Sequence, residues 1–510
     1  MDESSISSSA STASSVDLEA HPLTQKEESK NELELSRTIS RKITNSEILI
    51  KEAQSSDKPL PPITSDLVIF EPDDPLCPLN WPLRTKLVNA TRILWAPFGI
   101  QIGSAIVAPS TKEIARVFHV CHTVATLSTS LFIFGFAAGP VIWGPLSELY
   151  GRRPILLLSS FGYLCFAFGA ATAKDIQTLM LCRFFCGFIG GAPAVVTPSS
   201  LSDMFPKSQR GIAMSGFGLI IFSGPMIAPV IGGYTTSNLG YRWNLYFAGF
   251  FGCVSFMLLL WFKESHHPTL LTQRAEELRR RTGNRAIYAA HEEVSLSVKE
   301  IFKYNIARPL RMLVSEPILA LVSLYNAFMY GILYLLLTAV PLAFGHLGET
   351  QNLPYLALFI GIIFGTIIII SFNNNKRKNG PEDRLPPMLV GSILFPIGMF
   401  WFGWTSSLHW IIPTLGLVFV GAGLITVFLP CLTYIVDVYL HISASALASN
   451  AFLRAGFGGA FPLFAHQMFA AMHIDWGTTL IGCFSLVLVP VPFIFYRYGS
   501  IIRSKSKMAN

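Results

Sequence analysis

The sequence predicts an all-α membrane protein with twelve transmembrane helices in two halves of six. Hydrophobic residues make up 51% of the 510 residues and charged residues only 14%, well below the roughly 25% that is typical of soluble domains. Apolar segments long enough to cross a hydrocarbon core of roughly 30 Å recur from Val88 onward. So much apolar surface requires lipid to cover it.

The twelve spans follow the apolar runs between polar loops. Their expected ranges are 88–110, 123–143, 155–173, 177–198, 211–235, 243–262, 315–341, 352–372, 386–404, 410–436, 446–470 and 476–496. The expected organisation is a disordered cytosolic tail (1–86), an N-terminal six-helix half (87–262), a cytosolic central loop (263–314), a C-terminal six-helix half (315–497) and a cytosolic C-terminal tail (498–510).

The N-terminal tail is rich in serine and charge up to about residue 66, and it lacks the apolar content that would offset the entropy of folding. It does not have the charged start and apolar stretch of a cleaved signal peptide. Basic residues around Ser40 fit a kinase that recognises them. A solvated basic stretch is the equally good alternative.

Lysine and arginine place both termini in the cytosol, because cytoplasmic loops carry most of these residues. The loops on the side opposite the tail hold only Lys112, Arg116, Lys174 and Arg242. Basic residues spread between apolar runs do not form the patch of a nucleic-acid binder. The chain also lacks a Walker loop, a Ser-His-Asp set and a metal-ligand cluster, so we expect no enzyme, no cofactor, no metal and no use of ATP.

The loop between the second and third spans combines glycine with charge. It contains Gly144, Glu148, Gly151, Arg152 and Arg153. Glycine permits a tight turn, and an acid with two arginines beside helix ends can form a charge cluster that makes or breaks as helices slide. An ordinary basic cytosolic loop would explain the arginines but not the glycines.

Arg183 lies inside the fourth span. An isolated arginine in a membrane helix costs at least about 2.5 kcal/mol, so we expect it to face a polar interior and a partner. A functional role and a purely structural one are both open.

The fifth span is dense in glycine and proline. It carries Gly224, Pro225, Pro229, Gly232 and Gly233, which allow helices to approach closely and bend. Close packing alone would also produce this composition, and we attribute the pairs Gly99/Gly103, Gly135/Gly139 and Gly361/Gly365 to packing.

These three segments resemble motifs A, B and C of the major facilitator superfamily. Glu148 replaces the usual Asp of motif A and Leu149 a usual basic residue, while Ala228 stands where motif C often has Gly. Segments such as Asn80-Trp81-Pro82 and the stretch from Ala448 to Arg454 resemble fungal twelve-spanner drug:proton antiporters of the multidrug and polyamine exporter type.

The resemblance implies a proton-coupled antiporter that exports amphipathic or cationic small molecules, drugs or polyamines, by alternating access. It links Arg183 to proton coupling and the fifth span to antiport. Its partners would be a small-molecule substrate, protons and the lipid bilayer, and the transporter would act as a monomer in the plasma membrane or, alternatively, the vacuolar membrane. A proton-coupled uptake symporter for an organic nutrient is the alternative function.

The two halves also resemble each other, since Asp203 precedes Ser215–Gly218 as Asp437 precedes Ala455–Gly458, and a substrate site then lies between them at midplane. Candidate lining residues are Gln101, Tyr325, Asn326, Tyr330, Tyr334 and Phe457. Their aromatic faces would hold drugs or organic cations, although a tyrosine stripe at helical spacing also fits ordinary packing.

Asp437 and Arg454 flank a short cytosolic turn and are candidates to pair across it. A structural ion pair or a charge at each helix end is the favoured interpretation, and a gate that opens with the cytosolic vestibule is the alternative.

Overall fold

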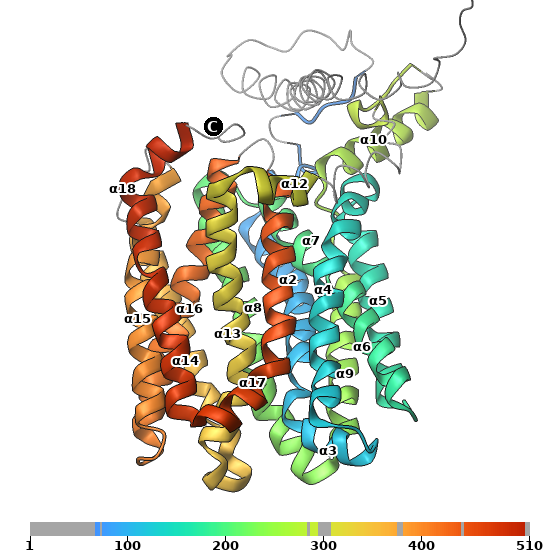
Figure 1. Cartoon of the computed structure of the whole chain (residues 1–510). Coiled ribbons are helices and arrows are strands. Elements are labelled where there is room, and N and C mark those ends of the chain that lie inside the picture. The colour runs from blue at the N-terminus through green and yellow to red at the C-terminus, as the bar shows by residue number, and fades with distance from the viewer. Residues whose placement is uncertain are drawn as a thin grey trace, which may run out of the picture. The chain divides into compact units, whose positions relative to one another are not determined.

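The structure, a computed structural model, describes residues 67–71, 74–282, 286–293, 308–374, 381–439 and 443–504 (Figure 1). Within these ranges the chain is almost entirely helical, which confirms the all-α fold class. The predicted tail up to residue 66, with Ser40, lies outside the described residues.

The N-terminal half contains the first six spans. Its helices are α2 (Leu83–Ala105) with η2 (Ala108–Ser110) and α3 (Thr111–Val117), α4 (His122–Tyr150), α5 (Arg152–Ala171), α6 (Ile176–Gly190) with α7 (Ala192–Met204), α8 (Lys207–Leu239) and α9 (Tyr241–Leu260). The fourth span is interrupted after Gly190 because Pro193 follows in the first turn of α7 and cannot donate a backbone hydrogen bond.

The C-terminal half follows a connecting segment with α10 (His267–Thr282), η3 (Ala290–Glu293) and α12 (Arg308–Ser315). Its helices are α13 (Pro317–Ala343), η5 (Gly345–Asn352), α14 (Tyr355–Asn374), η6 (Pro381–Arg384), α15 (Pro386–Trp404), α16 (Ile411–Val438), α17 (Ser443–Leu488) and α18 (Pro490–Ser504).

The last long helix of the structure contains two membrane spans, which are separated by one non-helical residue. Among the described residues, 11 helices are long and apolar enough to cross a membrane, and the last of them runs from Ser445 to Gly499. The chain reverses inside it at His473, whose φ of 56° and ψ of 173° are not helical. The eleventh span therefore ends before His473 and the twelfth begins after it, as the gap between 470 and 476 predicted.

The helices pack mainly within their own half, and two pairs of helices make the most extensive contacts between the halves. In the N-terminal half α4 lies on α6 and α5 on α9, and in the C-terminal half α13 lies on α17 and α15 on α16. These two pairs are α4 with α17 and α8 with α14, and α8 also contacts α16 and η5. The two pairs belong to spans two and eleven and to spans five and eight.

Glycine allows the closest helix contacts. A Cβ added at Gly139 on α4 would lie 3.1 Å from the Cα of Gly191, and one added at Gly361 on α14 would lie 3.0 Å from the Cα of Gly421. These distances leave no room for a side chain. The prediction that these glycines serve packing is confirmed.

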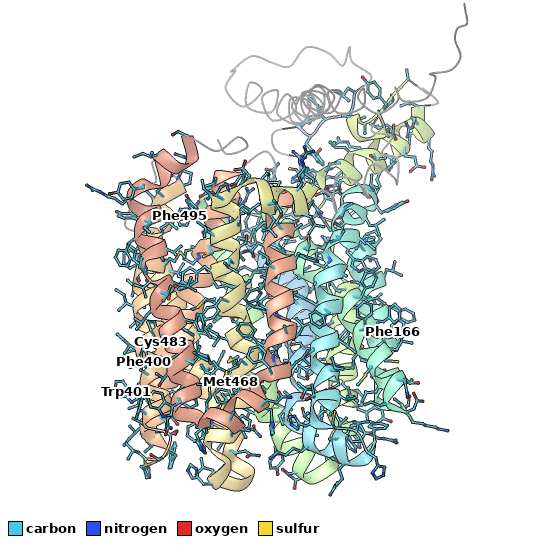
Figure 2. All side chains as sticks on the ribbon, viewed as in Figure 1. Phe166, Phe400, Trp401, Met468, Cys483 and Phe495 are labelled. Atoms are coloured by element: carbon cyan, nitrogen blue, oxygen red, sulfur yellow. The ribbon has the colours of Figure 1, made fainter. Side chains whose placement is uncertain are left out.

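The outer faces of the bundle are apolar, as a lipid-facing surface requires. Figure 2 labels Phe166, Phe400 and Trp401 at its edges. Val487 is 73% exposed and Leu181 59%. Figure 1 shows α10 and α12 at the opposite end of the bundle from α3, and the distribution of lysine and arginine makes the α10 end cytosolic.

The predicted tail extended to residue 86, but the structure orders its last part. Asp74 forms an ion pair with Arg274 of α10, the ammonium of Lys86 donates to the carbonyl of Leu79 at 2.7 Å, and α2 begins at Leu83. Apolar contacts add to these polar ones, since Cys77 is buried and Trp81 packs against the core of the N-terminal half. Prolines and acids interrupt the stretch, so it holds no apolar run long enough to span a membrane, and hydropathy assigned it to the tail.

Candidate functional site

Gly151 makes the turn between α4 and α5 possible. Its φ is 99°, a conformation that side chains other than glycine's disfavour. A Cβ at this position would also lie 2.8 Å from Oε2 of Glu264. Gly144, by contrast, has ordinary space around it, since a Cβ there would meet only Val195, at 3.7 Å.

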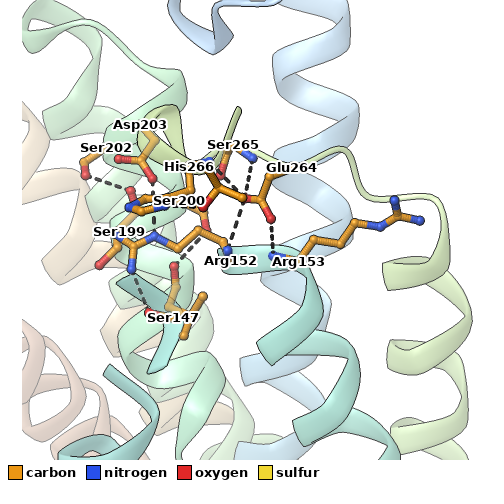
Figure 3. Close-up of polar contacts among 12 residues, drawn as sticks. Ser147, Arg152, Arg153, Ser199, Ser200, Ser202, Asp203, Glu264, Ser265 and His266 are labelled. Carbon is orange, nitrogen blue, oxygen red and sulfur yellow. Dashed lines mark hydrogen bonds and ion pairs between the residues drawn. The ribbon is translucent and has the colours of Figure 1, made fainter. Parts of the chain in front are cut away.

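Glu264 caps the helix that this turn starts. Its carboxylate accepts the backbone N–H of Arg152 at 3.1 Å and of Arg153 at 2.9 Å (Figure 3). It also accepts the N–H groups of Ser265 and His266. A carboxylate at a helix N-terminus is favoured by the unpaired N–H groups and the helix dipole. Sequence reasoning missed Glu264, and the available signal was a single acid directly after the sixth span.

The arginine of this loop pairs with a different acid from the one predicted. Nε of Arg152 lies 3.4 Å from Oδ2 of Asp203, at the end of α7, and its Nη1 donates to Oγ of Ser147 at 2.7 Å. Glu148, exposed on α4, interacts with Arg152 through its charge, and the ion pair of Arg152 is with Asp203. The guanidinium of Arg153 donates to the carbonyl of Leu260 at 2.8 Å. The predicted cluster exists, but Asp203 and Glu264 supply its acids.

The C-terminal half holds an equivalent ion pair. Nε of Arg384, just before the ninth span, lies 2.7 Å from Oδ2 of Asp437, at the end of the tenth. Arg152 and Asp203 occupy the matching positions around the third and fourth spans. The predicted pairing of Asp437 with Arg454 is therefore wrong, because Arg454 stands about three turns inside α17 and out of the cytosolic loop.

Arg183 joins three helices through backbone carbonyls. Its guanidinium donates to the carbonyls of Ser128 at 2.9 Å, Gly103 at 2.8 Å and Ser104 at 3.1 Å. It also lies over the ring of Phe132, 4.5 Å from the centroid, and only 1% of the residue is exposed. The expected partner of this charge is thus a set of carbonyls on α2 and α4.

The glycines of the fifth span bring α8 against two neighbours. A Cβ at Gly224 would lie 2.5 Å from the Cβ of Gln101 on α2, and Gly232 similarly faces the carbonyl of Ile106. Gly233 faces the side chain of Asn352, in the other half. Pro225 and Pro229 are buried between them. Gln101 itself is 2% exposed and donates to the carbonyl of Ile221 at 3.4 Å, so it belongs to this helix contact.

The predicted stripe on α13 is buried. Tyr325, Asn326, Tyr330 and Tyr334 are at most 2% exposed. The hydroxyl of Tyr334 lies 2.9 Å from Oγ of Ser104 on α2, which joins the two halves. Nδ2 of Asn326 donates to Oδ1 of Asn450 on α17 at 3.1 Å.

Arg454 stacks on two rings. Its guanidinium carbon lies 5.0 Å from the ring centroid of Tyr330 and 5.1 Å from that of Phe428 on α16. Phe428 in turn packs edge-on against Phe222 of α8, with the centroids 4.5 Å apart. Arg454 thus stands where the halves meet. Phe457, also predicted, contacts the ring of Phe461 at 5.3 Å on its own helix.

The external ends of the halves are in contact as well. The rings of His122 on α4 and His466 on α17 lie 4.3 Å apart, and the side chains of Thr123 and Gln467 lie 2.9 Å apart beside them.

Comparison with known proteins identifies the family. The model of the Major Facilitator Superfamily matches residues 93–462. The chain belongs to this superfamily. A solved structure, the xylose transporter XylE from E. coli in a partially occluded inward open conformation, superposes with a TM-score of 0.61 at 17% identity, over 81% of this chain and 98% of XylE. This likeness shows the major facilitator fold.

Fungal relatives are much more similar in sequence. The multidrug transporter FLU1 of Candida albicans is 50% identical, over 93% of this chain and 83% of FLU1. The multidrug transporter TPO1_2 of Candida glabrata is 48% identical, over 89% of this chain and 82% of the relative. The resemblance of this major facilitator protein to the fungal drug:proton antiporters is confirmed.

Proposed function

We propose that this transporter exports amphipathic small molecules from the cytosol in exchange for entering protons. The glycine-rich face of α8 is the main support for the proposal. It resembles the antiporter motif, and its glycines let the backbone of α8 lie directly against Gln101 of α2. Both fungal relatives named above are multidrug transporters, which supports the same function. We propose the plasma membrane as the site of action.

The two cytosolic ion pairs fit the alternation between states that this function needs. Arg152 with Asp203 and Arg384 with Asp437 each tie two consecutive spans of one half. Because each ion pair lies within one half, each half can move as a rigid unit while the contacts between the two halves break and re-form. The hydrogen bonds of Arg183 to α2 and α4 support a role in holding these two helices together. If Arg183 affects proton coupling, it would do so through the positions of α2 and α4.

Export is tested by measuring accumulation in cells that lack or overproduce the protein, with and without a protonophore. We expect overproduction to lower the accumulation of a labelled lipophilic azole several-fold, and the protonophore to abolish the effect. Labelled spermidine, measured in parallel, tests polyamine export. Higher accumulation on overproduction would contradict antiport and favour the uptake symporter.

Two glycine variants on one helix serve as matched controls. Gly224→Ala places a Cβ 2.5 Å from the Cβ of Gln101, whereas a Cβ at Gly216 would meet nothing within 4 Å. We expect Gly224→Ala to lose export at unchanged expression and Gly216→Ala to retain it. Equal activity of the two variants would mean that the close contact of α8 with α2 is not needed for transport.

A further inference from the structure

Positive charge dominates the interior of the spans. Arg183 and Arg454 stand well inside their helices, while the acidic residues of the described spans lie near helix ends. These acids are Glu113, Glu148, Asp203, Asp437 and Asp475. In a low-dielectric interior an uncompensated cation attracts anions and repels other cations.

Arg454 is the cation that remains available. Within the described part of the chain it makes no hydrogen bond or ion pair, and none of its guanidinium nitrogens is shut off from solvent. The residue is only partly buried. A guanidinium carries five N–H donors in a planar fork that matches a carboxylate or sulfonate. Here the guanidinium lies over the rings of Tyr330 and Phe428, and their attraction helps to hold it in place.

The same stacking disfavours a cationic substrate. A drug cation would bind to the faces of aromatic rings, but the guanidinium of Arg454 already lies over the rings of Tyr330 and Phe428. A second positive charge there would be repelled by the first.

A further unused donor lies one turn away. Asn450 is four residues before Arg454 and therefore on the same face of α17. Its Nδ2 is buried and has no acceptor, while its Oδ1 accepts from Asn326. The Oδ1 of Asn326 has no donor among the described residues either, so this amide pair holds one unused donor and one unused acceptor beside the face of α17 that carries Arg454.

We propose that the guanidinium of Arg454 binds the negative group of a substrate, so that amphipathic organic anions, each an aromatic body bearing a carboxylate or sulfonate, are the preferred class among the exported molecules. The inference rests on the proposed export function and narrows its substrate. The charge is held by the fork of Arg454, and the flat body lies against the aromatic side chains at the meeting of the halves.

The test uses two probes that keep their charge at every pH. Radiolabelled 2-naphthalenesulfonate and (2-naphthylmethyl)trimethylammonium share an apolar body and differ in sign. Binding is measured to the purified full-length protein in nanodiscs of phosphatidylcholine, which has no net charge. We expect the sulfonate to bind at least tenfold more tightly than the ammonium, and Arg454→Gln to remove that preference. Arg454→Lys, which keeps the charge but not the planar fork, should retain part of it.

The control variant is Arg497→Gln, which removes an exposed arginine of α18 and should leave both affinities unchanged. Neutral 2-naphthol should still bind Arg454→Gln, showing that the variant is folded. Equal binding of the two probes, preference for the ammonium, or unchanged sulfonate binding in Arg454→Gln would overturn the proposal. Absence of sulfonate binding in these nanodiscs would overturn it too. Export that fails while selective binding persists would count against the export function alone.

Discussion

Two arginines inside the membrane show two ways of accommodating the same charge. Arg183 is 1% exposed, and three carbonyls from α2 and α4 accept its hydrogen bonds. Arg454 is partly exposed and rests on the faces of Tyr330 and Phe428 without an acceptor. Each guanidinium nitrogen of Arg183 has a carbonyl acceptor in the protein, while the N–H groups of Arg454 are still free to donate.

We propose that this difference, more than depth in the membrane, distinguishes a structural arginine from a functional one. Breaking contacts to backbone carbonyls would release α2 from α4, so Arg183 cannot exchange partners during a transport cycle without loosening its own half. Stacking is compatible with exchange, because a ring face holds the guanidinium plane while its N–H edge stays free. We therefore expect mutations at Arg183 to affect stability and mutations at Arg454 to affect selectivity.

The largest effect is expected at Arg183. Arg183→Met removes three hydrogen bonds from a charged donor to buried carbonyls, which should cost about 2–5 kcal/mol of folding free energy. The thermal unfolding midpoint of the full-length protein in detergent measures this loss. Arg153→Met is the matched control, since Arg153 is exposed and donates to a single carbonyl. An unchanged midpoint for Arg183→Met together with lost transport would move Arg183 from the structural class to the functional one.

A smaller, charge-specific effect is expected at Asn326. Asn326→Asp keeps the shape of the side chain and places a carboxylate beside Asn450, one turn from Arg454. A nearby negative charge would compensate the guanidinium, so sulfonate binding should fall about tenfold and ammonium binding should rise. Asn326→Ser removes the amide without adding charge and should leave the ratio of the two affinities near its original value. If both variants change that ratio equally, the selectivity does not depend on the charge of Arg454.

The fold was predictable because hydropathy is a local property. Each span is a predominantly apolar segment of about 20 residues, and the turn at His473 lies in the short gap between two such segments. The cytosolic position of Asp203 and Asp437 was also visible, since each follows an apolar run directly. The similarity between the two halves of the sequence was enough to predict that Asp203 and Asp437 occupy equivalent positions.

The partners of the site residues were much less predictable. Glu264 contacts the N–H of Arg152 across 112 residues, a distance over which no spacing rule operates. Arg454 was assigned to Asp437 because the two are close in sequence, but α17 carries Arg454 into the membrane while Asp437 stays at the end of α16 with Arg384. Contacts between spans depend on which helices pack side by side, and hydropathy does not encode that.

The smallest effect is expected where the surroundings of the two arginines meet. The carbonyl of Ser104 accepts from Arg183, and its Oγ donates to the carbonyl of Gln101 at 2.7 Å, so the hydroxyl of Tyr334 is the donor in its 2.9 Å contact with that Oγ. Tyr334→Phe and Ser104→Ala should each cost less than about 1 kcal/mol, because a hydrogen bond between membrane helices is worth about 0.6 kcal/mol on average. In a double-mutant cycle on thermal stability, the double variant should be no less stable than the less stable of the two single variants, since both changes remove the same hydrogen bond. Fully additive losses would mean that the hydroxyls do not bond across the halves, and the surroundings of Arg183 and Arg454 would then be energetically independent.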